Sequence, residues 1–359
     1  MLRFFRHFDW LIFFLALILA LLGLVVLKSI APSLVTQQIV WLVLGLVFFF
    51  VFSQIDYRRY PRFAWIFYFS SIFFLLLTFI FGRAIRGSVR WLEIGGFGLQ
   101  PSELVKPFLI LFFASFFASE EEMNLKRILT GFGLLLPPFL MIFFQPDLGS
   151  SLVVLFFWLG IVLAKGMKGK WLVLSSILFL LIVPLVWFFL KDYQKQRLLT
   201  FLNPQIDALG SGFNVIQSMI AVGSGQFLGR GLGRGTQSHL SFLPERHTDF
   251  IFASLAEELG FVGSFLLLGL FFLLLWRILN LARNSRDQLS FLIYIGVFTL
   301  LFSQILVNLA MNLGLLPVTG ITLPLISYGG SSLLSTMIAL GVVVGIGKEK
   351  EEKQAVEIR

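Results

Sequence analysis

Long runs of apolar residues, each bounded by short polar segments, dominate this chain of 359 residues. A helix needs about 20 apolar residues to cross the hydrocarbon core of a bilayer, so each sufficiently long run predicts a membrane span. The pattern therefore predicts an all-α polytopic integral membrane protein forming a single membrane domain over residues 1–359. About ten spans are expected, near residues 9–28, 37–54, 62–82, 102–119, 128–144, 148–165, 170–190, 250–276, 289–312 and 325–347.

The longest polar interruption, at about residues 191–248, lies between the seventh and eighth expected spans. It predicts one large extramembrane loop within the domain. Eight glycines crowd residues 210–235 of this loop, which indicates tight turns and close approach of the backbone to other groups. Apolar residues at helical spacing between Phe213 and Val222 favour a half-helix at the membrane interface over a flexible connector.

The composition agrees with a chain that has lipid as its solvent. Hydrophobic residues make up 58% of the sequence, charged residues only 13%, and the mean hydropathy is +0.92, which together exclude a soluble domain of this length. Cysteine is absent, so a disulfide framework and a thiolate metal site are both excluded. The three histidines are too scattered in the sequence to indicate a zinc cluster.

The distribution of basic residues predicts the orientation of the chain. Of the 28 lysine and arginine residues, 17 fall at the termini and in the loops on one side of the membrane, against four in the short loops on the other. Because cytoplasmic loops carry an excess of Lys and Arg, both termini are expected in the cytoplasm and the long loop outside it. The net charge of +9 is spread over short loops rather than gathered in one patch, so no nucleic-acid partner is expected.

A few charged residues fall at the depth of the membrane, where each costs roughly 2.5–3.5 kcal/mol to insert. Glu103 and Lys106 are three residues apart at the start of the fourth span, so they share a helix face and are able to pair. A pair that only pins the helix end and a pair with a functional role are both open. Asp147 follows a proline in a short outer turn and is interpreted as a helix cap. Glu257 and Glu258 are expected to face buried basic groups.

Asp249 lies where the long polar loop enters the membrane, between His247-Thr248 and an apolar run. One interpretation is an N-cap, because aspartate often precedes a hydrophobic helix. The other is a reactive carboxylate, with its charge tuned by Arg246 and His247 and with access to a substrate that has a lipid tail and a polar head. The local pattern alone leaves both interpretations open.

Several ordered motifs carry a resemblance to a known family. The run from Phe242 to Ala253 reads FLPERHTDFIFA, and the chain closely resembles the SEDS proteins of bacterial shape, elongation, division and sporulation there. Within that family the PERH sequence, the PVTG turn and the short tails are similar to the RodA branch rather than the FtsW branch. Further matching motifs are RW at 90–91, QPSELVK at 100–106, QPDLG at 145–149, GFNVIQS at 212–218, GTQS at 235–238, PVTG at 317–320 and PLISYGGSS at 324–332.

The resemblance implies a fold of ten membrane helices in the bacterial inner membrane, with the active site on the extracytoplasmic side. It implies a peptidoglycan glycosyltransferase that polymerises lipid II, an undecaprenyl diphosphate-linked disaccharide pentapeptide, for cell-wall elongation and cell shape. The implied partners are a class B penicillin-binding transpeptidase and other proteins of the elongation complex.

The resemblance also implies roles for individual residues. Asp249 matches the essential aspartate of the family. Glu103 and Lys106 match residues of a cavity, and Gln217 and Ser327 match polar groups of the shared motifs.

A mechanism follows as a hypothesis. An acceptor sugar hydroxyl displaces the diphosphate leaving group in one inverting step, with Asp249 as the general base, a contribution typically worth about 10²–10⁴ in rate. Basic residues hold the diphosphate and stabilise its developing charge. A divalent cation, Mg²⁺ or Mn²⁺, bridging the carboxylate and the diphosphate is an alternative, although no dedicated ligand cluster can be read from the sequence. The candidate diphosphate-binding residues are Arg90, Lys106, Arg197 and Arg246.

Two other classes of function remain open at the level of composition. A lipid II flippase or transporter would suit ten spans and intramembrane charges equally well. A noncatalytic scaffold of an elongation or division complex is the third class, but it leaves the glycine-rich outer loop without a task. Glycan synthesis by the purified protein and its partner from labelled lipid II would separate the three.

Overall fold

The computed structural model describes residues 8–85, 88–94, 97–119, 123–167, 188, 195, 199–201, 211–240 and 242–357. Helices account for most of this part of the chain. The first helices are α2 (Trp10–Ile30), η1 (Pro32–Leu34), α3 (Val35–Ser53), η2 (Tyr57–Arg59), α4 (Tyr60–Phe81), α5 (Pro101–Ala118), α6 (Leu125–Phe144) and α7 (Leu148–Ala164). After the gap come α10 (Ser211–Ser224), α11 (Thr236–His239), α12 (Ile251–Arg283), α13 (Gln288–Asn312) and α14 (Gly330–Glu357).

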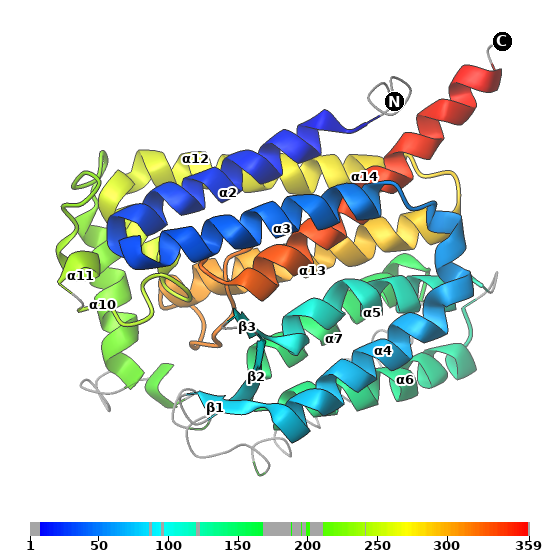
Figure 1. Cartoon of the computed structure of the whole chain (residues 1–359), viewed down its shortest axis with the longest axis horizontal. Helices are drawn as coiled ribbons and strands as arrows, with labels where there is room; N and C mark the ends of the chain where they lie inside the picture. Colours follow the sequence, from blue (N-terminus) through cyan, green and yellow to red (C-terminus); the bar gives the residue numbers. More distant parts are fainter. Residues whose placement is uncertain are drawn as a thin grey trace.

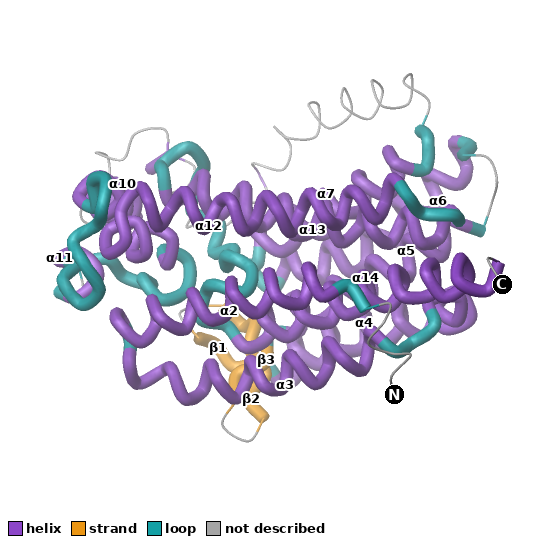
Figure 2. Tube along the Cα trace, turned by 90° about the horizontal axis from the view of Figure 1, so that it is seen from above, coloured by secondary structure: helices purple, strands orange, loops and turns teal. Residues whose placement is uncertain are grey.

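The long helices lie side by side along the longest axis of the molecule (Figure 1). Helices α2, α3, α12, α13 and α14 form one group, while α4, α5, α6 and α7 form the other, and α13 packs on α5 and α7 between the two groups. Helices α10 and α11 lie at one end of the bundle, and α14 ends at the opposite end (Figure 2). Residues near the start of α12 and the end of α13 therefore share an end of the bundle with α10.

Eight helices within the described residues are long and apolar enough to cross a membrane. They confirm a polytopic helical membrane protein. The expected sixth span corresponds to the shorter apolar helix α7, and the expected seventh span at 170–190 lies almost wholly outside the described residues. The prolines of α5 and α6 lie inside helices that continue through them.

A small antiparallel sheet was not expected from the sequence. Strands β1 (Arg83–Ile85), β2 (Ser88–Ile94) and β3 (Phe97–Leu99) follow one another in the order β1-β2-β3 between α4 and α5. The stretch is too short and too polar to span a membrane, and hairpin pairing satisfies its backbone groups instead. The sheet places Arg90, on β2, next to the start of α5.

Helix α12 differs most from its prediction. It continues to Arg283, and it is broken at Gly260, where φ is +66°. The carbonyls of Glu257 and Glu258 accept hydrogen bonds from the N–H groups of residues 230 and 231, while the N–H groups of residues 261 and 262 donate to the carbonyls of residues 226 and 227. The preceding loop thus satisfies the backbone groups that the break leaves without partners in the helix. We call residues 251–259 the short first half of α12 and residues 261–283 its long second half.

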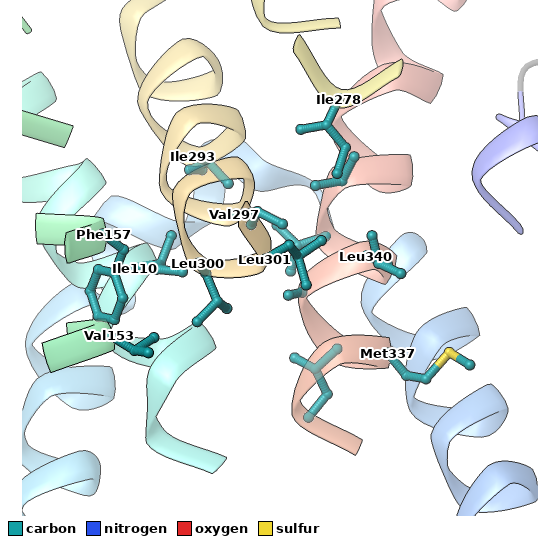
Figure 3. Packing of buried hydrophobic residues seen from close by; sticks show 14 of the residues in the cluster. Ile110, Val153, Phe157, Ile278, Ile293, Val297, Leu300, Leu301, Met337 and Leu340 are labelled. Atoms are coloured by element: carbon teal, nitrogen blue, oxygen red, sulfur yellow. The ribbon is translucent and has the colours of Figure 1, made fainter. Parts of the chain in front are cut away.

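The core lies around α13 and α14. In Figure 3, Ile110 of α5 and Val153 and Phe157 of α7 lie on one side of α13, and Met337 and Leu340 of α14 lie on the other. Residues Gly330–Gly347 of α14 are buried throughout the span, whereas α12 exposes a long apolar face. Helix α14 therefore lies inside the bundle, while the second half of α12 has an apolar face at the surface of the bundle.

Candidate functional site

The candidate site begins at the turn before α12. The N–H groups of Thr248 and Phe250 both donate to the carbonyl of Glu245, which closes the turn around Asp249. Phe250, not Asp249, occupies the N-cap position of α12. The interpretation of Asp249 as the N-cap residue is therefore wrong, because the helix begins one residue later than a cap at Asp249 requires.

Two buried asparagines hold the backbone of Asp249. Asn308 and Asn312 lie four residues apart on α13, both fully buried, and each donates from Nδ2 to the main-chain carbonyl of Asp249 at 3.0 Å. Oδ1 of Asn312 accepts from the N–H of Ala253 at 3.1 Å, and Nδ2 of Asn308 also donates to the carbonyl of Ile321 at 2.7 Å. We call these two residues the amide pair. It fixes the main chain of Asp249 against α13 without using its carboxylate.

The loop between α13 and α14, residues 313–329, passes beside Asp249. Ser327 donates from Oγ to the carbonyl of Thr248 at 2.7 Å and accepts from the N–H of Leu323 at 2.8 Å. Gly320 has φ of +78°, and a Cβ added there would lie 3.7 Å from Oδ2 of Asp249. Ser327, predicted as a site residue, thus holds the turn that carries Asp249.

The same loop is fixed to α3 through Tyr328. Its hydroxyl donates to Oε1 of Gln37 at 2.6 Å, its N–H donates to the carbonyl of His247 at 2.8 Å, and the side chain of Gln38 bonds the neighbouring main chain. Burial raises the pKa of the Tyr328 hydroxyl. The phenol therefore keeps its proton at neutral pH and remains a donor.

A second polar cluster lies at the start of α5. Nζ of Lys106 lies 2.5 Å from Oε1 of Glu103, and both side chains are buried. The hydroxyl of Ser150 donates to the same carboxylate oxygen at 3.3 Å. The predicted pairing of Glu103 with Lys106 is confirmed, and it neutralises two charges that would each be costly at this depth.

Asp147 joins the second cluster. One carboxylate oxygen caps α7 by accepting from the N–H of Ser150, as predicted, and the other accepts from the side chains of Gln100 and Ser102, each at 2.8 Å. Nη1 of Arg90 lies 3.7 Å from Asp147 Oδ1. We call Arg90, Glu103, Lys106 and Asp147 the charged cluster.

The charged cluster still has hydrogen-bonding capacity. Nε of Arg90 and Oε2 of Glu103 are buried and have no hydrogen-bond partner among the described residues. A buried polar atom in that state costs about 1–3 kcal/mol, so each is a candidate to bind a substrate group. The cluster as a whole pairs two cations with two carboxylates.

The α13–α14 loop connects the charged cluster to Asp249. A Cβ at Gly149, two residues after Asp147, would lie 2.8 Å from the carbonyl of Thr319 and 2.7 Å from Cγ1 of Ile321. Gly149 therefore permits α7 to start directly against the part of the loop that also passes Asp249. The N–H of Gln100 donates to Oγ of Ser331 at 2.8 Å, which ties the start of α5 to α14 beside the same loop. The charged cluster and Asp249 thus both lie against the α13–α14 loop.

The other predicted site residues are placed differently. Gln217 lies on α10, and its buried Oε1 has no hydrogen-bond partner among the described residues. Its neighbour Ser218 donates to the carbonyl of Asn312, so α10 packs on the end of α13 near the amide pair. Arg246 donates from Nε to the carbonyl of Ile30 at 3.4 Å and points towards the end of α2. Arg197 lies outside the described residues.

Glu257 and Glu258 hold the loop that precedes α12. The expectation that they face basic groups is met at Glu258, which lies 2.9 Å from Nε2 of the partly exposed His239, whereas the hydrogen bonds of Glu257 among the described residues come from main-chain N–H groups and hydroxyls. Glu257 accepts from the N–H groups of Gln237 and Ser238 at 2.8 and 3.0 Å. Glu258 accepts from Nε2 of His239 at 2.9 Å and from Oγ of Ser29 at 2.5 Å. Main-chain N–H groups, hydroxyls and one imidazole bind the two buried carboxylates, and Oε2 of Glu258 has no hydrogen-bond partner among the described residues.

Sequence reasoning missed the amide pair and Gly320. A signal for the amide pair was present, because two asparagines four residues apart in an otherwise apolar span share one face and need buried partners. The signal does not identify the partner, the main-chain carbonyl of Asp249, which lies 59 residues away from Asn308 along the chain.

A metal site built by the protein alone is not found in the described ranges. No group of three or more His, Cys, Asp or Glu side chains lies there in an arrangement suited to a metal ion. Mg²⁺ is often bound through one or two carboxylates together with substrate phosphates, so a single aspartate is compatible with that mode.

Comparison with known proteins gives a consistent picture. The model of the FtsW, RodA and SpoVE family, described as cell cycle proteins, matches residues 9–352. The peptidoglycan glycosyltransferase MrdB of Escherichia coli K12 is 40% identical over 312 residues, covering 86% of this chain and 84% of its own.

Two solved proteins share the fold. One is a chain from a study of how a peptidoglycan synthase complex coordinates polymerization and crosslinking; it is 38% identical, with a TM-score of 0.84, covering 96% of this chain and 99% of its own. The other is the rod shape determining protein RodA of Thermus thermophilus, 32% identical, with a TM-score of 0.73, covering 96% of this chain and 98% of its own. A variant of that RodA with one aspartate changed to alanine has the same similarity.

Proposed function

This chain belongs to the FtsW/RodA/SpoVE family of cell cycle proteins, and we propose that it joins the sugars of lipid II into glycan strands with Asp249 as its general base. Relatives that it matches over most of their length are peptidoglycan glycosyltransferases, and one acts in cell shape as a rod shape determining protein. The chain is a membrane glycosyltransferase of peptidoglycan synthesis. The observation that carries the proposed role of Asp249 is the amide pair, which anchors its main chain from α13.

The proton transfer is assigned to the Asp249 carboxylate. In polymerisation an acceptor sugar hydroxyl attacks the anomeric carbon of the donor, the bond to the diphosphate breaks, and the hydroxyl proton must leave. A base held in one geometry reduces the reorganisation needed in the transition state, which is the contribution of the amide pair. The carboxylate accepts the proton, and inversion at the anomeric carbon follows from the single displacement.

The diphosphate is assigned to the charged cluster. Lys106 and Arg90 are the cations there, and the unpartnered Nε of Arg90 is a donor for a phosphate oxygen. Arginine binds phosphate through its fork of N–H groups, and such charge-assisted bonds are about twice as strong as neutral ones. The negative charge that grows on the leaving group is thereby placed beside fixed cations, while the base lies across the α13–α14 loop.

A divalent cation would be held by Asp249 together with the substrate diphosphate, because Mg²⁺ is often bound by one or two carboxylates and the phosphates of a substrate. Bound there, Mg²⁺ or Mn²⁺ would neutralise charge on the leaving group. The remaining predicted residues, Gln217 and Arg246, belong to the same end of the bundle and are proposed as substrate contacts at its rim.

The end of the bundle with Asp249 is proposed to face away from the cytoplasm, because the basic loops and both termini belong to the other end. The fold of a chain from a peptidoglycan synthase complex is shared by this chain, which supports a synthase partner. We assign that partner to the class B penicillin-binding transpeptidases, which would crosslink strands as they emerge on the same side.

A reconstituted polymerisation assay tests this function. The full chain with its transpeptidase partner, given labelled lipid II while crosslinking is blocked, is expected to make long glycan strands. Asp249→Asn is expected to make none, while Asp56→Asn, the same chemical change at the distant cap of η2, is expected to leave synthesis intact. Glycan synthesis by Asp249→Asn would remove Asp249 from the role of base. Translocation of lipid II without any polymer, by the unmodified chain, would support a flippase instead.

A further inference from the structure

A cavity lies at the end of the bundle opposite Asp249. Its volume is about 380 Å³, within the range of small-molecule sites. It is formed where α12 ends and α13 begins, against η2 and the inner part of α14; its lining residues include Tyr57, Arg58, Leu281, Arg286, Asp287 and Tyr294. Asp249 precedes α12 and Arg286 follows it, so the unbroken stretch of α12 from residue 261 to residue 283, about 34 Å long, separates the cavity from the candidate catalytic site.

The charge of the lining favours a single anion. Arg58 and Arg286 contribute two positive charges, and Asp287 contributes one negative charge. The Asp287 carboxylate is already engaged, because it accepts from the Tyr57 hydroxyl at 2.7 Å and from the N–H and hydroxyl of Ser290, each at 2.9 Å. The net charge of the lining is therefore +1, and the two guanidinium groups supply it.

A tyrosine hydroxyl at the cavity is without a partner. Tyr294 of α13 lines the cavity, its side chain is only 2% exposed, and its hydroxyl makes no hydrogen bond to any described residue. A hydroxyl that lines a cavity and has no partner in the protein can donate to a ligand or a water there. A phenol beside two guanidinium groups is a suitable donor for an oxyanion.

The apolar part of the lining points to a lipid rather than a free ion. Leu281, Leu289 and Ile346 line the same cavity, and it opens between the ends of helices that cross the membrane. Basic pockets between transmembrane helices at the cytoplasmic side commonly bind the headgroups of anionic lipids. We propose that this cavity binds the phosphate-bearing headgroup of an anionic glycerophospholipid, with Arg58, Arg286 and the Tyr294 hydroxyl on the phosphate and the leucines against the glycerol end.

The site is separate from the polymerase site, and its lining comes from four different helices at this end. A lipid bound there would bridge η2, the α12–α13 turn and α14. It would therefore stabilise the inner end of the bundle while leaving the chemistry at the other end unchanged.

Native mass spectrometry of the full chain in detergent tests the proposal directly. Phosphatidylglycerol is expected to remain bound under conditions that remove phosphatidylcholine. The double variant Arg58→Gln/Arg286→Gln is expected to bind phosphatidylglycerol at least about tenfold more weakly, because two charge-assisted contacts are lost. The matched control Arg59→Gln/Arg283→Gln removes two positive charges from the same end, outside the lining, and is expected to retain the lipid.

Two further measurements test whether a binding-site variant still folds and whether the bound phosphate belongs to a lipid. Tyr294→Phe removes only the hydroxyl and is expected to weaken phosphatidylglycerol binding by about threefold to tenfold, with no loss of thermal stability in lipid-free detergent. Inorganic phosphate is expected not to displace the lipid. Equal binding of both lipids, equal loss in the two double variants, or displacement of the lipid by millimolar inorganic phosphate would each overturn the proposal, the last in favour of a simple anion site.

Discussion

The charged cluster and the amide pair handle buried polar groups in opposite ways. In the charged cluster, two cations and two carboxylates compensate one another, and the tightest contact is the 2.5 Å pair of Lys106 with Glu103. At Asp249, neutral amides bind the main-chain carbonyl, and no cation is among the groups that hold it in this way. The first arrangement stabilises charge where it is needed. The second fixes the position of a base through its main chain.

Mutations in the two regions are therefore expected to differ in their effects on stability and on the reaction. A cation opposite a base would favour its charged form and lower its pKa, which weakens it as a proton acceptor. The amide pair adds no positive charge beside the base, because both of its members are neutral. Changes in the charged cluster are therefore expected to destabilise the protein as well as slow the reaction, whereas changes at Asp249 are expected to affect the reaction alone.

The largest expected effect is on the activity of Asp249→Asn. The amide keeps the size and the main-chain contacts of the side chain but cannot accept the hydroxyl proton, so polymerisation falls by about 10²–10⁴. The melting temperature in detergent is expected to stay within about 2 °C of the unmodified chain. Strand synthesis from labelled lipid II and a thermal unfolding scan measure the two quantities. A large drop in melting temperature would show that Asp249 is structural.

Lys106→Met is expected to have the largest effect on stability. It leaves the Glu103 carboxylate buried without its cation, which costs about 3–5 kcal/mol. Adding Glu103→Gln in the same chain removes the uncompensated charge and is expected to recover most of that stability, but not glycan synthesis. Thermal unfolding of the single and double variants checks this, and recovery of both properties would assign the pair a purely structural role.

Asn308→Leu is expected to have an intermediate effect on both properties. It removes donors to the carbonyls of Asp249 and Ile321. The Asp249 carbonyl keeps its hydrogen bond from Asn312, whereas the Ile321 carbonyl loses its donor, which costs about 1–3 kcal/mol. Because the effect on the reaction acts through the position of the base, kcat is expected to fall by about tenfold with little change in KM. The matched control is Ser303→Ala, because Ser303 is also buried on α13 but bonds only within its helix. An equal loss in Ser303→Ala would show a general effect on α13.

The smallest expected effect on the reaction is that of Asp147→Asn. The side-chain oxygen can still cap α7, but the attraction to Arg90 at 3.7 Å is lost. The new amide NH₂ also replaces the oxygen that accepts from Gln100 and Ser102, which costs about 1–3 kcal/mol of stability. A raised KM for lipid II is expected, because Arg90 is then less firmly placed to bind diphosphate. An unchanged KM would remove Arg90 from the diphosphate site.

Much of the fold could be predicted from the sequence, because the hydropathy of a segment indicates whether it lies in lipid or in water. Most spans are predicted within a few residues where the chain is described, except that α12 continues to Arg283, seven residues beyond its predicted end, and the short motifs identify the family correctly. The break in α12 at Gly260 could not be predicted, since a single glycine within a helical pattern is tolerated and does not by itself indicate a break. What permits the break is the loop that precedes α12, and local hydropathy does not report where that loop packs.

The candidate site could also be predicted only in part. Glu103 with Lys106 was predictable, because opposite charges three residues apart on one helix face can pair. The direction of Arg246, towards α2, and the hold of Asn308 and Asn312 on Asp249 depend on tertiary packing between segments remote in sequence. Residue type indicated which groups needed partners, and only the fold identifies those partners.

The break at Gly260 also bears on how the enzyme meets bilayers of different thickness. A span longer than the local hydrocarbon thickness tilts, and tilt in a continuous helix would carry both of its ends along. Here the second half of α12 has an apolar face at the surface of the bundle, while the first half is bound to the preceding loop and, through Ala253 and Asp249, to α13. The second half is thus able to follow the membrane while the segment beside Asp249 stays fixed to the bundle.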